Sequence, residues 1–298
     1  MSLKTRFITL GTAGGPVPKL HRAQPSHAIT RGDRVILIDC GEGAMQQLMR
    51  AGIDFRRVEK IILSHHHFDH IGSLFTCLGI NMMLQRKQPI TIYGPPGTHQ
   101  IVEGLAMACD VPQAIGFGVT GQSLPHPRDF VSVEEIAPGV TFEIDDIRIS
   151  CCENTHYRAE AELGTEGPIS LSLRFDAPDR SIVYTGDTGP CRLVENLAKG
   201  AQLLVGEMML AEQIIAQLQE KNPHMTSERI AMMGQHLHSH HLSPEQLGDL
   251  AVRAGVAHVV AVHIPLNSIT PETAPDFTAR ISQVFSGQVS IANDLDQF

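Results

Sequence analysis

The stretch SHHHFDHIG, residues 64–72, places four histidines and one aspartate within six positions. It directly follows the apolar run KIIL, which is typical of a buried strand. His65 and His67 are two residues apart, so their side chains can point to the same side of an extended chain. Asp69 and His70 follow where the chain turns toward a helix and can face a second point. Imidazole and carboxylate groups are ligands of Zn²⁺, so the stretch predicts a site that serves two metal ions.

Further metal ligands are expected at the ends of other apolar runs. ISCCENTH ends in His156, SIVYTGD ends in Asp187, and VVAVHIP carries His263. Loops at strand ends commonly hold functional residues on a rigid scaffold. We therefore expect these side chains to gather at one edge of a pair of packed sheets.

The sequence resembles the metallo-β-lactamase fold superfamily, whose H-x-H-x-D-H signature is matched by His65, His67, Asp69 and His70. ILIDCGEG before the signature and VYTGDT after it extend the resemblance over most of the chain. It implies an α/β fold, a four-layer αβ/βα sandwich, formed by residues 1–298 as a single domain.

The same resemblance implies how seven ligands divide between two divalent ions. One ion would be held by His65, His67 and His156, the other by Asp69, His70 and His263, and Asp187 would bridge them. Zn²⁺ is the first expectation for the metal, with Mn²⁺ or Fe²⁺ as alternatives, because His and Asp ligands accept all three.

Several residues indicate the branch of the superfamily. Asp187 and His70 disfavour antibiotic hydrolysis, and His67, where flavin-linked oxygen reductases carry Glu, disfavours oxygen chemistry. The runs LLVGEMML and HLSPEQLGDLAVRAGVAHVVAVHIP resemble the ribonuclease Z group, which includes arylsulfatase-like and cyclic-nucleotide phosphodiesterase-like relatives. In that group a Glu and a His lie beside the metals, and these roles fall to Glu207 and His241.

Simpler interpretations of some of these residues remain open. Glu207 could be a solvated carboxylate at a helix start, and His241 could be an ordinary residue of a His-rich loop. His224 is a weaker candidate, because only His241 is followed by a helix, an AG turn and a final strand. Gly14 and Gly15 predict a tight turn that either contacts substrate or has no functional role.

The expected reaction is ester hydrolysis by a hydroxide that bridges two metal ions. Asp69 would orient this hydroxide, and His241, held by Glu207, would protonate the leaving alkoxide. Ribonuclease Z grips tRNA with a basic Gly/Pro-rich arm, whereas only YRAEAELGTEGP follows His156, and the net charge is −9. We therefore expect a small phosphodiester, sulfate ester or related ester as substrate.

Two other functions remain as alternatives. tRNA 3′-end processing makes RNA a possible but disfavoured partner, and a non-catalytic binding protein would have lost ligands, which this sequence has not. The resemblance to the ribonuclease Z group implies a homodimer. The stretch between Glu207 and His241 has the Met and Ile spacing of an amphipathic helix, either a packing surface or a lid.

Composition places further limits on the protein. With 42% hydrophobic and 18% charged residues, the sequence is typical of a folded globular protein. It has neither a secretory signal nor an apolar run of about 18 residues, so we expect a cytoplasmic protein without a membrane partner. Its six cysteines form no C-x-x-C pair and are expected to be reduced core or edge thiols.

Overall fold

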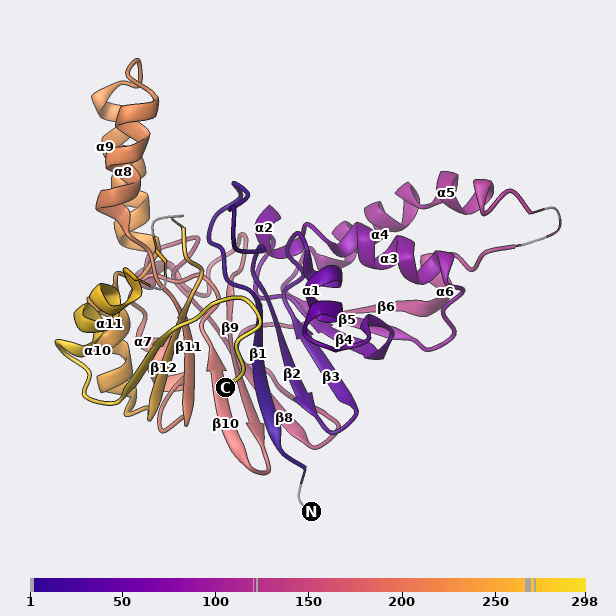
Figure 1. Cartoon of the computed structure of the whole chain (residues 1–298), viewed down its shortest axis with the longest axis horizontal. Helices are drawn as coiled ribbons and strands as arrows, with labels where there is room; N and C mark the ends of the chain where they lie inside the picture. Colours follow the sequence, from indigo (N-terminus) through magenta and orange to yellow (C-terminus); the bar gives the residue numbers. More distant parts are fainter. Residues whose placement is uncertain (1–2, 120, 122, 266–268, 271) are drawn as a thin grey trace. The chain divides into compact units, whose positions relative to one another are not determined.

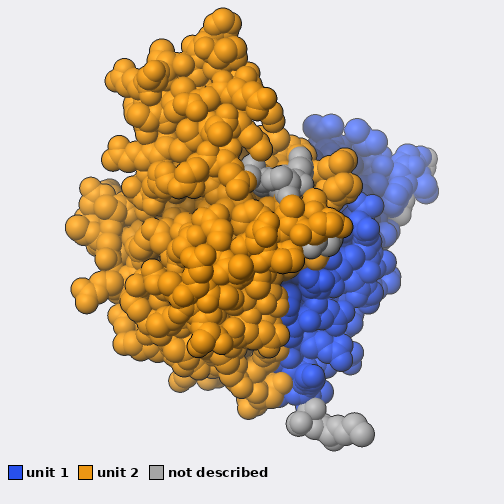
Figure 2. Space-filling model, turned by 60° about the vertical axis from the view of Figure 1, so that its left-hand side comes forward, with its two compact units in different colours: residues 1–11, 23–137, 294–298 blue, residues 12–22, 138–293 orange. Residues whose placement is uncertain are grey.

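The computed structural model of the chain describes residues 3–119, 121, 123–265, 269–270 and 272–298. The chain forms two compact units, the first from residues 1–11, 23–137 and 294–298 and the second from residues 12–22 and 138–293 (Figure 2). Each unit has its own hydrophobic core of buried aliphatic side chains. The assignment of residues 1–298 to a single domain stays a prediction.

The first unit is a six-stranded sheet with helices packed on it (Figure 1). Its strands follow one another in sequence order: β1 (Thr5–Gly11), β2 (Ser26–Arg31), β3 (Arg34–Ile38), β4 (Val58–Ile62), β5 (Ile90–Gly94) and β6 (Val131–Glu135). Its helices are α1 (Ala44–Arg50), α2 (Phe68–Ile71), α3 (Leu74–Met83), α4 (Thr98–Ala108), α5 (Asp110–Ile115) and α6 (Pro127–Phe130), with a 3₁₀ turn η1 (Phe55–Arg57).

The second unit is a seven-stranded sheet, also in sequence order. Its strands are β7 (Thr141–Ile144), β8 (Ile147–Glu153), β9 (Leu171–Ala177), β10 (Arg180–Tyr184), β11 (Leu203–Glu207), β12 (His258–Val262) and β13 (Gln288–Ile291). Its helices are α7 (Arg192–Leu197), α8 (Ala211–Lys221), α9 (Ser227–His240), α10 (Pro244–Ala254) and α11 (Ala274–Ser282), with a 3₁₀ turn η2 (Glu160–Glu162).

Strand direction decides where the functional residues lie in each unit. β3, β4, β5 and β6 are parallel neighbours, as are β10, β11, β12 and β13. β8 and β10 both run antiparallel to β9 and therefore share one direction. Because the carboxyl ends of strands with one direction meet at one edge of a sheet, residues that follow β8, β10, β11 and β12 share an edge.

The stretch between Glu207 and His241 forms two helices instead of the single amphipathic helix that its spacing suggested. α8 ends at Lys221, and the turn before α9 contains Pro223, which cannot continue a helix interior. The two helices pack on each other as a projecting hairpin (Figure 1). Among the described residues, no helix is long and apolar enough to cross a membrane.

Candidate metal centre

The signature histidines of the first unit cluster just after β4. His65 and His70 are fully buried, Asp69 is 5% exposed, and His67 is an exposed residue that directly precedes α2. The ring centroids of His65 and His67 are 4.9 Å apart, and those of His65 and His70 are 4.0 Å apart. All four ligands predicted for this unit are thus brought together on one short turn and the helix that follows it.

Asp39, which follows β3, orients two of these histidines although the sequence analysis gave it no role. Its carboxylate accepts hydrogen bonds from the Ser64 amide at 2.7 Å, the Ser64 hydroxyl at 2.9 Å and Nδ1 of His70 at 2.8 Å. Since the Ser64 hydroxyl donates to Asp39, its oxygen accepts from Nδ1 of His65 at 3.0 Å. Both imidazoles therefore carry the proton on Nδ1 and present Nε2 to a metal, an arrangement common among metal-bound histidines.

His66 has a structural environment that sets it apart from its neighbours. Its Nε2 lies 2.8 Å from the Thr98 hydroxyl at the start of α4. Burial lowers the pKa of His66, which favours the neutral imidazole. The sequence predicted no role for His66, and its contact with Thr98 gives it a role in packing against α4.

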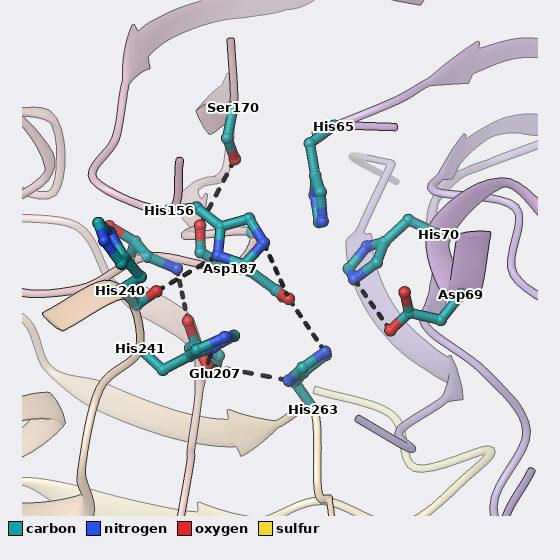
Figure 3. A network of polar contacts seen from close by, with 12 residues as sticks. His65, Asp69, His70, His156, Ser170, Asp187, Glu207, His240, His241 and His263 are labelled. Carbon is teal, nitrogen blue, oxygen red and sulfur yellow. Dashed lines mark hydrogen bonds and ion pairs between the residues drawn. The ribbon is translucent and has the colours of Figure 1, made fainter. Parts of the chain in front are cut away.

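The second unit brings its three predicted ligands together around one carboxylate (Figure 3). Oδ2 of Asp187 lies 3.8 Å from Nε2 of His156 and 3.1 Å from Nε2 of His263. All three side chains are buried, with 1 to 4% of their residue surface exposed. One oxygen placed beside two imidazole nitrogens is the arrangement expected of ligand atoms that converge on metal ions.

Glu207 and His241 form a buried pair beside this cluster. Nδ1 of His241 donates to Oε2 of Glu207 at 2.7 Å, and Oε1 of Glu207 accepts the Thr188 amide. Glu207 is the last residue of β11 and is fully buried, so it is not a solvated carboxylate at a helix start. Burial raises the pKa of the Glu207 carboxyl group. Burial acts to lower the pKa of His241, but the Glu207 and Asp187 carboxylates together outweigh it and the pKa is raised.

His240 is a second residue that the sequence analysis did not find. Its Nδ1 donates to the Thr155 carbonyl at 2.6 Å, and its own carbonyl accepts Nδ1–H of His156 at 3.3 Å. The second contact fixes the proton of His156 on Nδ1 and presents Nε2 to Asp187. One residue therefore joins the end of α9 to the loop that carries a predicted ligand.

Gly14 belongs to the loop that packs against His263 within the second unit. Its amide donates to the Ile264 carbonyl at 2.8 Å, and the Ile264 amide donates to Thr12 at 2.7 Å. A Cβ atom on Gly14 would lie 2.4 Å from the His263 carbonyl oxygen. His263 itself has a φ of 56°, which is uncommon for a residue with a side chain. Gly14 is therefore required for close packing beside a predicted ligand, and its contact with substrate stays a prediction.

Two other segments from the sequence analysis have clear positions. His224 lies exposed in the turn between α8 and α9, at the opposite end of α9 from His241. The segment 157–168 is short and held to the sheet by Arg158, which pairs with Glu153 at 3.4 Å and donates to the Thr165 carbonyl at 2.6 Å. No extended arm follows His156 within the described residues.

Comparison with known proteins agrees with this geometry. A family model described as beta-lactamase superfamily domain matches residues 34–264. The chain belongs to this superfamily. Among solved structures, the metallo-β-lactamase fold protein YhfI from Bacillus subtilis has a TM-score of 0.71 at 17% identity, covering 99% of this chain and 98% of the other. The short form of human tRNase Z has a TM-score of 0.67 at 18% identity, covering 98% of each chain.

Curated relatives place the chain in the ribonuclease Z branch of the metallo-β-lactamase superfamily. Ribonuclease Z of Mycolicibacterium gilvum strain PYR-GCK is 29% identical, covering 97% of this chain and 94% of the relative. Ribonuclease Z of Mycobacterium sp. strain KMS is 30% identical with the same coverage. The α/β fold class, the metallo-β-lactamase type and the assignment as a metal-dependent hydrolase are thereby confirmed.

These relatives change the order of the expected substrates. The sequence favoured a small ester over tRNA as substrate, whereas the curated relatives favour the ribonuclease alternative. The comparisons do not bear on arylsulfatase activity, zinc as the metal or a homodimer, and these stay predictions.

Proposed function

We propose that this hydrolase cleaves phosphodiester bonds with two divalent metal ions, and that the 3′ end of an RNA precursor is its first candidate substrate. One observation carries the proposal: Oδ2 of Asp187 lies beside Nε2 of His156 and Nε2 of His263, next to a buried His241–Glu207 pair. The Asp187, His156 and His263 side chains would provide metal ligands, and the His241–Glu207 pair would provide a proton donor. Curated relatives named ribonuclease Z support the choice of a phosphodiester.

The donor sets of both units fit divalent ions. His65, His70 and His156 each have Nδ1 in a hydrogen bond, which leaves Nε2 as the ligand atom. The proposed ligands are His65, His67 and His156 for one ion, Asp69, His70 and His263 for the other, with Asp187 shared. Two such ions would activate a water molecule and stabilise negative charge on the oxygens of the ester.

The chain's own residues would then move protons and orient the reactants. Asp69 has a carboxylate oxygen 3.7 Å from Nε2 of His70, so it can orient a water molecule as well as bind metal. His241 has Nδ1 fixed by Glu207, which leaves Nε2 as the donor to the leaving alkoxide. Its raised pKa keeps more of this imidazole protonated near neutral pH.

A small phosphodiester is the second candidate substrate. The segment 157–168, where ribonuclease Z would carry its basic arm, is a short loop fixed by Arg158. The net charge of −9 also disfavours a large contact with RNA.

One assay separates the candidates. The metal-loaded protein is given a precursor tRNA with a 3′ extension, bis(p-nitrophenyl) phosphate and p-nitrophenyl sulfate. We expect cleavage of the first two and loss of both activities in Asp187→Asn, with Asp33→Asn as an exposed carboxylate control. Cleavage of the small diester alone would favour the second candidate. Turnover of the sulfate alone would contradict the proposal.

A further inference from the structure

A histidine just before the last turn of α9, His236, has its ring close to that of His241. His236 precedes His240 by four residues, so the two lie on one face of the helix, and their ring centroids are 5.1 Å apart. The ring of His236 is 5.9 Å from that of His241 at an interplanar angle of 83°. The sequence analysis did not single out His236, and the proposed function gives it no role.

Three imidazole rings surround His241, and they differ in exposure. His156 lies 4.9 Å from His241 and His263 lies 6.1 Å from it, measured between ring centroids, and both are buried. His236 is exposed. An ester whose leaving oxygen reaches His241 from solvent would therefore meet His236 as the accessible neighbouring ring.

The position of His236 is fixed by contacts of the turn that follows it. Ser239 has its carbonyl oxygen against Gly189, where a Cβ atom would lie 2.1 Å away. His240 binds both Thr155 and His156, as described above. The Met209 amide donates to the carbonyl of Leu242 at 2.7 Å. This anchoring holds the last turn of α9 in place, although the rest of the hairpin projects from the unit.

We propose that His236 is a specificity-determining residue, which donates a hydrogen bond to a phosphate oxygen of an anionic phosphodiester as the leaving oxygen meets His241. This inference rests on the proposed function and narrows its substrate class to anionic esters. An imidazole carries an N–H donor in its neutral and its charged form, so the contact does not require a change of protonation. Hydrogen bonds to an anionic oxygen are stronger than those between neutral groups.

The helix supplies a matched control for this proposal. His238 is exposed two residues further along α9, and two residues correspond to about 200° around a helix, so it points to the opposite face. A general loss of helix stability or of surface charge would affect His236→Ala and His238→Ala equally. A substrate contact would affect only the first.

The experiment compares metal-loaded wild type, His236→Ala, His236→Gln and His238→Ala. We expect His236→Ala to raise KM for bis(p-nitrophenyl) phosphate about tenfold, the loss of one hydrogen bond to an anion. KM for the uncharged p-nitrophenyl acetate, metal content and melting temperature should stay at the wild-type values. His236→Gln, which keeps an N–H donor, should restore part of the affinity.

A binding measurement keeps this test separate from that of the proposed function. The affinity of the metal-loaded protein for inorganic phosphate is measured by calorimetry in all four proteins, and His236→Ala alone should weaken it. If wild type cleaves no phosphodiester, the proposed function fails while the phosphate measurement still decides the role of His236. Equal affinities in the two alanine variants, or an unchanged KM in His236→Ala, would overturn the inference.

Discussion

Nδ1 of His241 donates a 2.7 Å hydrogen bond to Oε2 of Glu207, and both residues are buried. The two come from different elements, since Glu207 ends β11 and His241 follows α9. A carboxylate in this position fixes the tautomer of the imidazole and favours its charged form. His241 therefore has the properties of a general acid whose orientation and protonation are supported by Glu207.

Replacement of His241 by Ala should reduce turnover and leave the metal in place. Loss of a general acid commonly costs about 100- to 10,000-fold in rate. The measurements are kcat on bis(p-nitrophenyl) phosphate and metal content of the same sample. Loss of one metal ion in this variant would instead make His241 a ligand, an outcome its position near Asp187 and His263 also allows.

The pH profile should reveal the influence of Glu207 on His241. An acid is active in its protonated form, so the contribution of His241 to turnover is complete below its pKa and is lost as pH rises through that pKa. In wild type this fall lies above the ordinary histidine pKa, because Glu207, assisted by Asp187, outweighs the effect of burial. In Glu207→Gln the largest influences that raise the pKa of His241 are lost while burial still lowers it, so the fall should move to lower pH. The exposed Glu212→Gln is the control. An unmoved profile in Glu207→Gln would mean that another group donates the proton.

Asp39→Asn should weaken metal binding without touching a ligand. An Asn side chain has one acceptor oxygen, so its amide nitrogen would face either the Ser64 amide N–H or the hydroxyl of Ser64 and the imidazole N–H of His70. Hydrogen bonds that orient these residues would be lost in either case. Disruption of a residue that orients metal ligands typically costs about 10- to 100-fold in affinity. Competition with a coloured chelator measures this, with Asp33→Asn as the exposed control. Wild-type affinity in Asp39→Asn would show that the signature histidines need no such support.

Gly14→Ala should displace His263. The added methyl group would lie 2.4 Å from the carbonyl oxygen of His263. Moving this backbone costs more free energy than moving the end of a flexible side chain. We expect lower metal content and a lower melting temperature. Gly79→Ala is the control, since the space around Gly79 in α3 is open and Ala favours a helix by about 1 kcal/mol. If both variants bind metal as wild type does, Gly14 is not required beside His263.

The sequence predicted which of the proposed ligands gather in the second unit, because each of them follows an apolar run that forms a strand. His156, Asp187 and His263 all follow strands of one direction in the second unit. Residues that are far apart in the sequence therefore lie close together at one edge of the sheet. Asp39 also follows an apolar strand, β3. Its role depends on hydrogen bonds to Ser64 and His70, which cannot be predicted from the positions of these residues in the sequence.

The helical hairpin was harder to predict for a physical reason. Amphipathic spacing runs through Ile214, Ile230 and Met233, and only Pro223 and its polar neighbours mark the turn. The functions of His236 and His240 depend on where the last turn of α9 is anchored. That anchoring comes from Thr155 and Gly189, which are distant in sequence.

The most direct test of the dinuclear account is a titration of metal-free protein with Zn²⁺, followed by hydrolysis of bis(p-nitrophenyl) phosphate. The account predicts that turnover rises to a plateau at two equivalents per chain, because both ions act on the same ester. A plateau at one equivalent, or no turnover at any loading, would contradict it.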